Sequence, residues 1–177
     1  RKLSATAYAL LAALFAGSDA SEVVEMPNLM PGASRRHTLP GKTKALTGSR
    51  INGESFRMSD LRGQVVLIDF MATWCQPCVA EHPRIREFYD LYDDRGCEVV
   101  GVNMDVDRAK LRRYLELNRL PWITLHEKEP ARQNPAIRQF GIMSIPVLIL
   151  VDRDGKVVSV DARGAELEQL WAEMFGD

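Results

Sequence analysis

An apolar run followed at once by two closely spaced cysteines is the feature that most constrains this chain. Residues Val65 to Met71 are apolar except for Asp69 and rich in β-branched side chains, which predicts a buried β-strand. Cys75 and Cys78 come next, and a helical pattern runs from Val79 to about Tyr92. The stretch therefore predicts a strand, a Cys-x-x-Cys pair at the mouth of a helix, and the helix itself.

This position gives the two cysteines different chemistry. Cys75 is expected where unpaired backbone N–H groups and the positive end of the helix dipole stabilise a thiolate. Cys78 follows one helical turn later on the same face, close enough to form a disulfide with Cys75. We therefore expect a redox-active disulfide, with Cys75 as the exposed attacking thiol and Cys78 as the resolving thiol.

Other roles for the cysteine pair have less support in the sequence. A structural zinc site would need two more ligands at suitable spacing, and none of the other candidates is paired in this way: Cys97, His37, His82, His126. A purely structural disulfide closing so short a loop would add little stability. We expect no metal and no cofactor besides the redox-active disulfide. Cys97 is expected to fill the core, with a redox role as the alternative.

The stretch Trp74-Cys75-Gln76-Pro77-Cys78 resembles the Trp-Cys-x-Pro-Cys motif of the thioredoxin superfamily. Further matches are Asp69 at the position of a buried acid, Glu81 just after the second cysteine, Pro83 within the helix, and the dipeptide Ile145-Pro146. Together they resemble the TlpA-like (ResA-like) branch of bacterial extracytoplasmic thiol-disulfide oxidoreductases, including planctomycete-type members. Two residues depart from the common pattern, Met71 where many relatives have Trp, and Gln76 where Gly or Glu is commoner.

The resemblance implies two sets of site residues. The catalytic set would be Cys75, Cys78, Asp69, Glu81 and Pro146, and the substrate-binding set Trp74, Gln76, Pro77 and Ile145. Asp69 and Glu81 would accept the proton of the resolving cysteine, with a structural role as the alternative for each. Pro146 would be cis and face the cysteines, leaving the Ile145 backbone to pair with an extended substrate segment. Trp74 could dock substrate or simply pack.

His82 is expected to be partly exposed, as a packing residue in the first turns of the redox helix. A role as metal ligand or base is the alternative for this residue.

The resemblance also implies the fold, a thioredoxin-like three-layer α/β/α sandwich with a mixed central sheet. An N-terminal β-hairpin is predicted around Asn52-Gly53. Asp107 is expected to cap a helix that runs to Asn118. This helix and a short strand over 121–125 match the helix-strand insertion of TlpA-like domains. The other expected elements are a strand over 97–104, a helix over 134–140, a hairpin of 147–151 with 156–160, and a helix over 166–175.

Three segments are expected along the chain. Residues 1–30 are expected to be a helical N-terminal extension, the tail of an upstream region, with a signal-peptide remnant as the alternative. Residues 31–44 are rich in Pro, Gly, Ser, Arg and Lys and are expected to be a linker. Residues 45–177 are expected to be the redox domain.

The composition is that of an ordinary globular protein and gives no reason to expect an unusual binding partner. The 177 residues are 46% hydrophobic and 27% charged, with a net charge of −1, which gives no reason to expect nucleic acid or a membrane surface as partner. The resemblance implies protein thiol or disulfide substrates and an upstream electron donor, which in such systems can be membrane-bound. It also implies an extracytoplasmic location, periplasmic or in the cell envelope.

Two rival functions share this fold. Thiol peroxidases of the peroxiredoxin type carry a Pro-x-x-x-Thr-x-x-Cys pattern, whereas Thr73 lies two residues before Cys75 and the required proline is absent. Copper chaperones of this fold resemble Cys-x-x-x-Cys with a distant His, whereas the spacing here is two. A non-catalytic interaction module is the remaining alternative.

Overall fold

A five-stranded mixed β-sheet forms the centre of the computed structural model, which describes residues 36–127 and 134–176. The strand order is β5-β4-β3-β6-β7, with the following bounds: β3 Val65–Met71, β4 Cys97–Asn103, β5 Ile123–His126, β6 Val147–Val151 and β7 Val157–Ser159. Strands β3, β4 and β5 run parallel, whereas β6 is antiparallel to both β3 and β7. The carboxyl ends of β3 and β4 therefore meet at one edge of the sheet.

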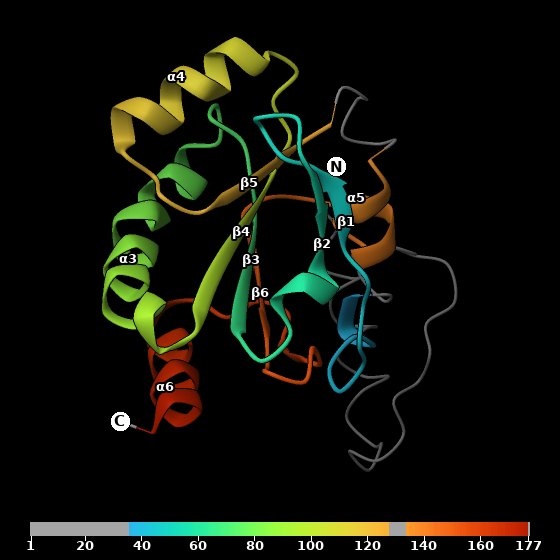
Figure 1. The fold of residues 1–177 in the computed structure, drawn as a ribbon, viewed down its shortest axis with the longest axis vertical. Coiled ribbons are helices and arrows are strands. Elements are labelled where there is room, and N and C mark those ends of the chain that lie inside the picture. The colour runs from blue at the N-terminus through green and yellow to red at the C-terminus, as the bar shows by residue number, and fades with distance from the viewer. Residues whose placement is uncertain (1–35, 128–133, 177) are drawn as a thin grey trace, which may run out of the picture.

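Helices α3 (Gln76–Tyr92) and α6 (Gly164–Phe175) cover one face of the sheet (Figure 1). Their apolar side chains pack on the face that carries Val65 and Leu67 of β3. Cys75 has an extended backbone and is the N-cap residue of α3. Pro77 lies in the first turn of the helix, a position that proline tolerates because no internal hydrogen bond is lost there. The redox-motif helix predicted from the sequence is confirmed.

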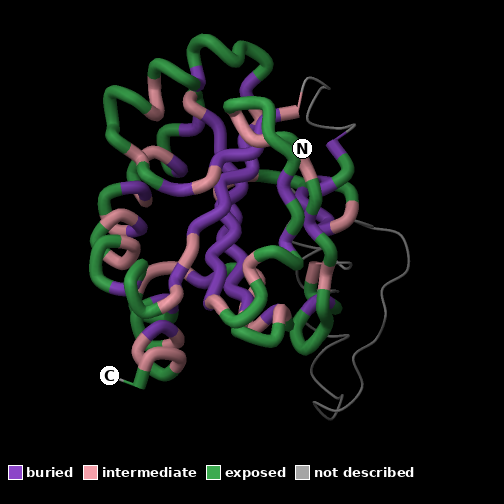
Figure 2. The backbone as a smooth tube through the Cα atoms, viewed as in Figure 1, coloured by how far each residue is buried: buried purple, intermediate pink, exposed green. Residues whose placement is uncertain are grey.

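The opposite face is covered by helix α5 (Pro135–Phe140) and by the antiparallel hairpin of β1 (Thr47–Ser49) and β2 (Ser55–Arg57). In Figure 1 these elements lie across the sheet from α3, so the three predicted layers are confirmed. Short 3-10 helices η1 (Met58–Leu61) and η2 (Asp93–Arg95) join the layers. Figure 2 shows that burial is concentrated on the central strands between the layers.

Helix α4 (Arg108–Asn118) and β5 form the predicted helix-strand insertion. The Asp107 side chain caps α4 by accepting hydrogen bonds from the backbone N–H groups of Ala109 and Lys110, as the sequence predicts. In Figure 1, α4 lies across the sheet edge where β3 ends and α3 begins. The insertion therefore borders the start of the redox helix.

The predicted linker is wrong for its described part. Leu39 is only 1% exposed and belongs to the core beneath β3 and β6. The backbone of residues 41–43 pairs with the start of β7, through hydrogen bonds between Gly41 and Val157 and between Val157 and Lys42. A sequence rich in Gly, Pro and Lys can still pair its backbone with a strand edge, and one apolar side chain suffices to anchor it. Residues 1–30, predicted to be helical, and 31–35 lie outside the described residues.

Within 36–127 and 134–176, no helix combines the length and the apolar character needed to cross a membrane.

Candidate active site

The two cysteines of the Cys-x-x-Cys pair are joined by a disulfide at the start of α3. Their sulfur atoms are 2.06 Å apart and their Cα atoms 5.3 Å apart. The backbone N–H of Cys78 donates a hydrogen bond to Cys75 Sγ at 3.3 Å, so a helix-terminal N–H already points at the sulfur predicted to become a thiolate. The structure thus places the pair at the helix mouth, as the sequence predicts.

Cys75 is less exposed than the sequence led us to expect. The residue is 6% exposed, because Met71, Ala72 and Cys78 form a small apolar cluster with it and half-buried side chains of Met104, Tyr114 and Ile145 pack around that cluster. The expectation of an openly exposed thiol is therefore wrong. The sulfur of Cys75 is therefore mostly covered by neighbouring side chains.

The predicted substrate-binding residues lie near the disulfide, either next to it in the sequence or packed against its cluster. Trp74 is 60% exposed, and Gln76 and Pro77 are exposed as well. Ile145 packs against the cysteine cluster, and the peptide bond between Ile145 and Pro146 is cis, as predicted. The loop between α5 and β6 therefore returns to the disulfide, and its proline lies at the same site as the cysteines.

Asp69 lies in the middle of β3 and is 2% exposed. Side chains alternate along a strand, so Asp69 faces the same way as Leu67, toward α3. Burial raises the pKa of the Asp69 carboxyl, and this effect outweighs the hydrogen bond and charge of His82, which lower it. Asp69 is thus a buried acid beneath the redox helix, as the sequence predicts.

His82 is buried, which corrects the expectation of a partly exposed packing residue. It is 4% exposed, and its Nε2 lies 3.2 Å from Asp69 Oδ2. The signal that could have found it is spacing: Cys78, His82 and Ile85 recur at helical intervals and all three are buried on the inner face of α3. A histidine in that register faces the sheet rather than solvent.

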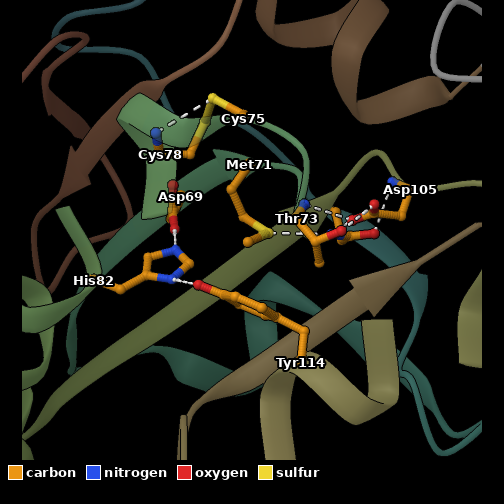
Figure 3. The surroundings of a disulfide bond; sticks show 9 residues. Asp69, Met71, Thr73, Cys75, Cys78, His82, Asp105 and Tyr114 are labelled. Atoms are coloured by element: carbon orange, nitrogen blue, oxygen red, sulfur yellow. Dashed lines mark hydrogen bonds and ion pairs between the residues drawn. A yellow bond between two sulfur atoms is a disulfide. The ribbon is translucent and has the colours of Figure 1, made fainter. Parts of the chain in front are cut away.

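Tyr114 of α4 completes a chain of three polar side chains. Its hydroxyl oxygen lies 2.7 Å from His82 Nδ1, so the imidazole is held from both sides (Figure 3). The rings of Trp122 and Tyr114 each lie 5.8 Å from the His82 ring between centroids. Burial, together with the charges of Asp69 and Asp105, raises the pKa of Tyr114 to about 12, so its hydroxyl keeps its proton near neutral pH. The sequence analysis assigned Tyr114 no role in the site.

Glu81 lies apart from this chain of contacts. Its side chain is half-buried and forms no hydrogen bond or ion pair with any other residue that the structure describes. The structure brings Asp69 together with His82 rather than with Glu81. A role for Glu81 in proton transfer stays a prediction.

A second polar cluster, which the sequence analysis missed, holds the loop in front of Cys75. Buried Asp105 accepts hydrogen bonds from the Thr73 backbone N–H at 2.8 Å and from the Thr73 hydroxyl at 2.6 Å. The Asn103 amide also donates to Asp105, at 2.7 Å, and to Met71 Sδ, at 3.1 Å. The ends of β3 and β4 are thereby joined directly beside the disulfide.

Cys97 is remote from this site. It is buried and pairs with Val65 at the start of β3, whereas Cys75 follows the end of that strand, which at about 3.3 Å a residue is roughly 20 Å away. Burial raises the pKa of Cys97 to about 12. Among the described residues, no three His, Cys, Asp or Glu side chains are grouped so that they could hold a metal ion.

Comparison with known proteins agrees with this geometry. A thioredoxin-like family model matches residues 63–157, more than half of the chain. The chain is 30% identical over 112 residues to the thiol-disulfide oxidoreductase ResA of Geobacillus thermodenitrificans, an alignment that covers 63% of this chain and 62% of that protein. The ResA of Halalkalibacterium halodurans is 28% identical over 125 residues, which cover 71% and 68% of the two chains.

Solved structures show the same fold. The thioredoxin domain of a thiol-disulfide oxidoreductase from Bacteroides vulgatus has a TM-score of 0.68 and 27% identity, covering 76% of this chain and 96% of that one. A thiol:disulfide interchange protein from Bacteroides sp. has a TM-score of 0.69 and 26% identity, covering 78% and 90%. The disulfide at the mouth of α3, the buried acid beneath it and these matches lead to one conclusion: the chain belongs to the thioredoxin-like family.

Proposed function

We propose that this protein is a thiol-disulfide oxidoreductase that reduces protein disulfides through the Cys75-Gln76-Pro77-Cys78 site. The observation that carries the proposal is the disulfide itself, whose first sulfur accepts a helix-terminal N–H while a buried carboxyl group lies beneath the helix. A pair placed in this way can exchange two electrons with another disulfide. The names of the ResA relatives support the same reaction class.

The reaction would begin from the reduced pair. The Cys75 thiolate attacks one sulfur of the substrate disulfide, the substrate S–S bond breaks, and the other substrate sulfur leaves as a thiolate. Cys78 then loses its proton and attacks Cys75 Sγ. This step forms the Cys75–Cys78 bond, breaks the mixed disulfide and releases the second substrate thiolate. Two electrons pass from the protein to the substrate, and an upstream thiol donor would restore the reduced pair.

Asp69 is the acceptor that we propose for the Cys78 proton. Its raised pKa suits a base that must gain and lose a proton near neutral pH, because a carboxylate with an ordinary pKa would hold the proton too weakly. Glu81 is a second candidate, supported by the family resemblance alone.

Exposed Trp74, Gln76 and Pro77, with Ile145 beside them, would form the surface that a substrate segment contacts. Pro146 has no backbone N–H, so a strand-like substrate segment would pair with the Ile145 backbone instead. The mostly covered Cys75 favours an extended segment over a bulky folded surface.

The cysteine variants test this reaction directly. Cys75→Ser should abolish reduction of a model protein disulfide such as insulin, because no attacking thiolate remains. Cys78→Ser should still attack but accumulate a mixed disulfide, visible as a larger mass in non-reducing analysis. A Cys78→Ser protein that turns over normally, or a parent that consumes hydrogen peroxide faster than it reduces disulfides, would overturn the proposal.

The direction of transfer is tested by equilibrating the pair with glutathione. We expect a potential near that of reducing members of the superfamily, about −270 mV, whereas a value near −120 mV would make the protein an oxidant. An extracytoplasmic location and an upstream electron donor belong to the same proposal and rest on the family resemblance. Cell fractionation of the native organism tests the location.

A further inference from the structure

The three side chains Asp69, His82 and Tyr114 come from three different elements and meet inside the molecule. Asp69 belongs to β3, His82 to α3 and Tyr114 to the α4 insertion. His82 is contacted at both ring nitrogens, at 3.2 Å by Asp69 and at 2.7 Å by Tyr114. Figure 3 shows them in a line that begins beneath Cys78 and ends at α4. We call these residues the Asp69–His82–Tyr114 chain.

The described residues that contact His82 come from several elements. Asp69 faces it from β3 and Tyr114 from α4, while the uncharged indole of Trp122 packs against its ring. Cys78 precedes it by one turn on the same face of α3. Asp105 lies beyond Tyr114 and affects that residue electrostatically. Asp69 and Cys78 are therefore the only two groups among these that exchange a proton in the proposed reaction.

The three residues have one hydrogen-bonding arrangement for each protonation state of Asp69, and in both arrangements the two ring nitrogens of His82 keep their partners. When Asp69 is ionised, His82 Nε2–H donates to the carboxylate and Nδ1 accepts the Tyr114 O–H. When Asp69 carries the proton, its O–H donates to Nε2, and Nδ1–H donates to the Tyr114 oxygen. A hydroxyl can both donate and accept, so Tyr114 fits both arrangements, whereas a fixed donor would fit only one.

A purely structural pair would not need these residue types. Isolated buried charges are costly, and replacing a buried polar pair by apolar residues of similar volume is often neutral or stabilising. A buried acid on the strand beneath a redox helix, with a buried histidine one turn after the redox cysteine, is instead typical of a site where a proton is moved.

We propose that His82 and Tyr114 are positioning residues for proton transfer, and that the Asp69–His82 pair accepts the Cys78 proton as one unit. This inference rests on the proposed function. In the resolving step the Cys78 S–H bond breaks and its proton passes to Asp69. The Cys78 thiolate forms the bond to Cys75, and the substrate sulfur leaves with the electron pair and takes a proton from water. Tyr114 holds the imidazole so that Nε2 stays on the Asp69 carboxylate in both states.

The test isolates the resolving step. The reduced full chain reacts with the aromatic disulfide dithiobis-nitrobenzoate, and the first thionitrobenzoate is released when Cys75 attacks. The second is released only when Cys78 resolves the mixed disulfide, so its rate reports the proton transfer. The rate is followed from about pH 5 to about pH 9, a range that brackets the ordinary pKa values of His and Cys. We expect it to rise with pH, because the pair accepts a proton only when Asp69 is ionised.

The variants should move the midpoint of this pH–rate profile by different amounts, with the largest shift for His82→Leu. Because the hydrogen bond and charge of His82 lower the pKa of Asp69, removing them should move the midpoint to higher pH. His82→Leu should shift it by about one pH unit or more, which makes resolution about tenfold slower below both midpoints. His82→Gln keeps one hydrogen bond and should rescue part of the shift. Tyr114→Phe should give a smaller shift in the same direction.

Tyr89→Phe is the matched control. Tyr89 also packs against Trp122, but its hydroxyl forms no hydrogen bond with any described residue, so the profile should not move. Unfolding midpoints of all variants show whether each is folded. If His82→Leu unfolds, Tyr114→Phe still decides the question.

The outcomes separate this inference from the proposed function. A parent that never releases the second thionitrobenzoate overturns the proposed function and the inference together. A parent that releases it, with His82→Gln and Tyr114→Phe profiles equal to that of the parent, overturns the inference alone. A midpoint that moves to lower pH in these variants also overturns it.

Discussion

At the scale of single residues, Asp69 is an ionisable carboxyl group that the fold buries in the middle of the sheet. Its register neighbours on β4 and β6 are Gly101 and Leu148, and its side chain is covered by α3. Among the residues that the structure describes, only His82 forms a side-chain hydrogen bond with it. The carboxylate is therefore stabilised less in the native state than in water, which is the physical meaning of its raised pKa.

This has a consequence for stability that can be measured. An acid whose pKa is raised on folding binds its proton more tightly in the native state, so its contribution to stability is largest at low pH. That contribution is lost as pH rises from the unfolded value of 3.8 through the raised folded value. The parent should therefore lose stability relative to Asp69→Asn between about pH 4 and neutral pH, by about 1.4 kcal/mol for each unit by which the pKa is raised.

Denaturant unfolding of the two proteins at several pH values measures this difference. Added salt serves as the control, since burial rather than surface charge causes the shift and salt should change the difference little. A difference that stays constant from pH 4 to neutral pH would contradict the assignment of Asp69 as a buried acid with a raised pKa.

At the scale of elements, the loop after β3 is fastened to the loop after β4. Asp105 accepts two hydrogen bonds from Thr73 and one from Asn103, and Thr73 lies two residues before Cys75. The mouth of α3 is thus fixed to the strand that leads into α4. The same α4 supplies Tyr114, so the insertion supports the site at two places.

Asp105→Ala should therefore affect both stability and activity. It leaves the Thr73 N–H and the Asn103 amide without their buried acceptor, which costs about 1 to 3 kcal/mol. Disulfide reduction should slow several-fold, because the loop that presents Cys75 loses its anchor.

The matched control is Asp107→Ala, which removes the N-cap of α4 and costs about 1 kcal/mol. It should leave the reduction rate unchanged, because Asp107 does not contact the Cys75 loop. Equal reduction rates for the two variants would mean that Asp105 supports only the fold.

At the scale of the whole molecule, the sheet is enclosed on both faces, and the segment before β1 is part of that enclosure. Leu39 packs with Leu46, Phe56 and the inner side chains of β3 and β6. Backbone pairing of residues 41–43 with β7 extends the same edge of the sheet. The domain therefore begins earlier than the predicted boundary at residue 45.

Leu39→Ala tests this boundary. Truncating a fully buried leucine typically costs about 2 to 5 kcal/mol, through lost burial and the cavity left behind. Leu117→Ala is the control, since Leu117 is 73% exposed on α4 and alanine suits a helix. Denaturant unfolding should separate the two variants clearly. Similar unfolding free energies would restore the view of residues 36–44 as a linker.

The sequence by itself determined the features that depend on local pattern. The apolar run of β3, the cysteine spacing at the start of α3 and the Asp107 cap of α4 are all confirmed, because each depends on residues a few positions apart. The three-layer fold followed from the resemblance that these local motifs carry. The buried acid Asp69 and the cysteine pair Cys75 and Cys78 could thus be found without coordinates.

Only the tertiary structure decided which side chains meet across elements. Thr73 and Asp105 are 32 residues apart, as are His82 and Tyr114. Both pairs exist because α3 follows the end of β3 and α4 follows the end of β4, at the same edge of the sheet. Likewise, the covering of Cys75 and the burial of Leu39 depend on segments distant in the chain. No periodicity or propensity encodes such contacts, since they are set by how packed elements are placed relative to one another.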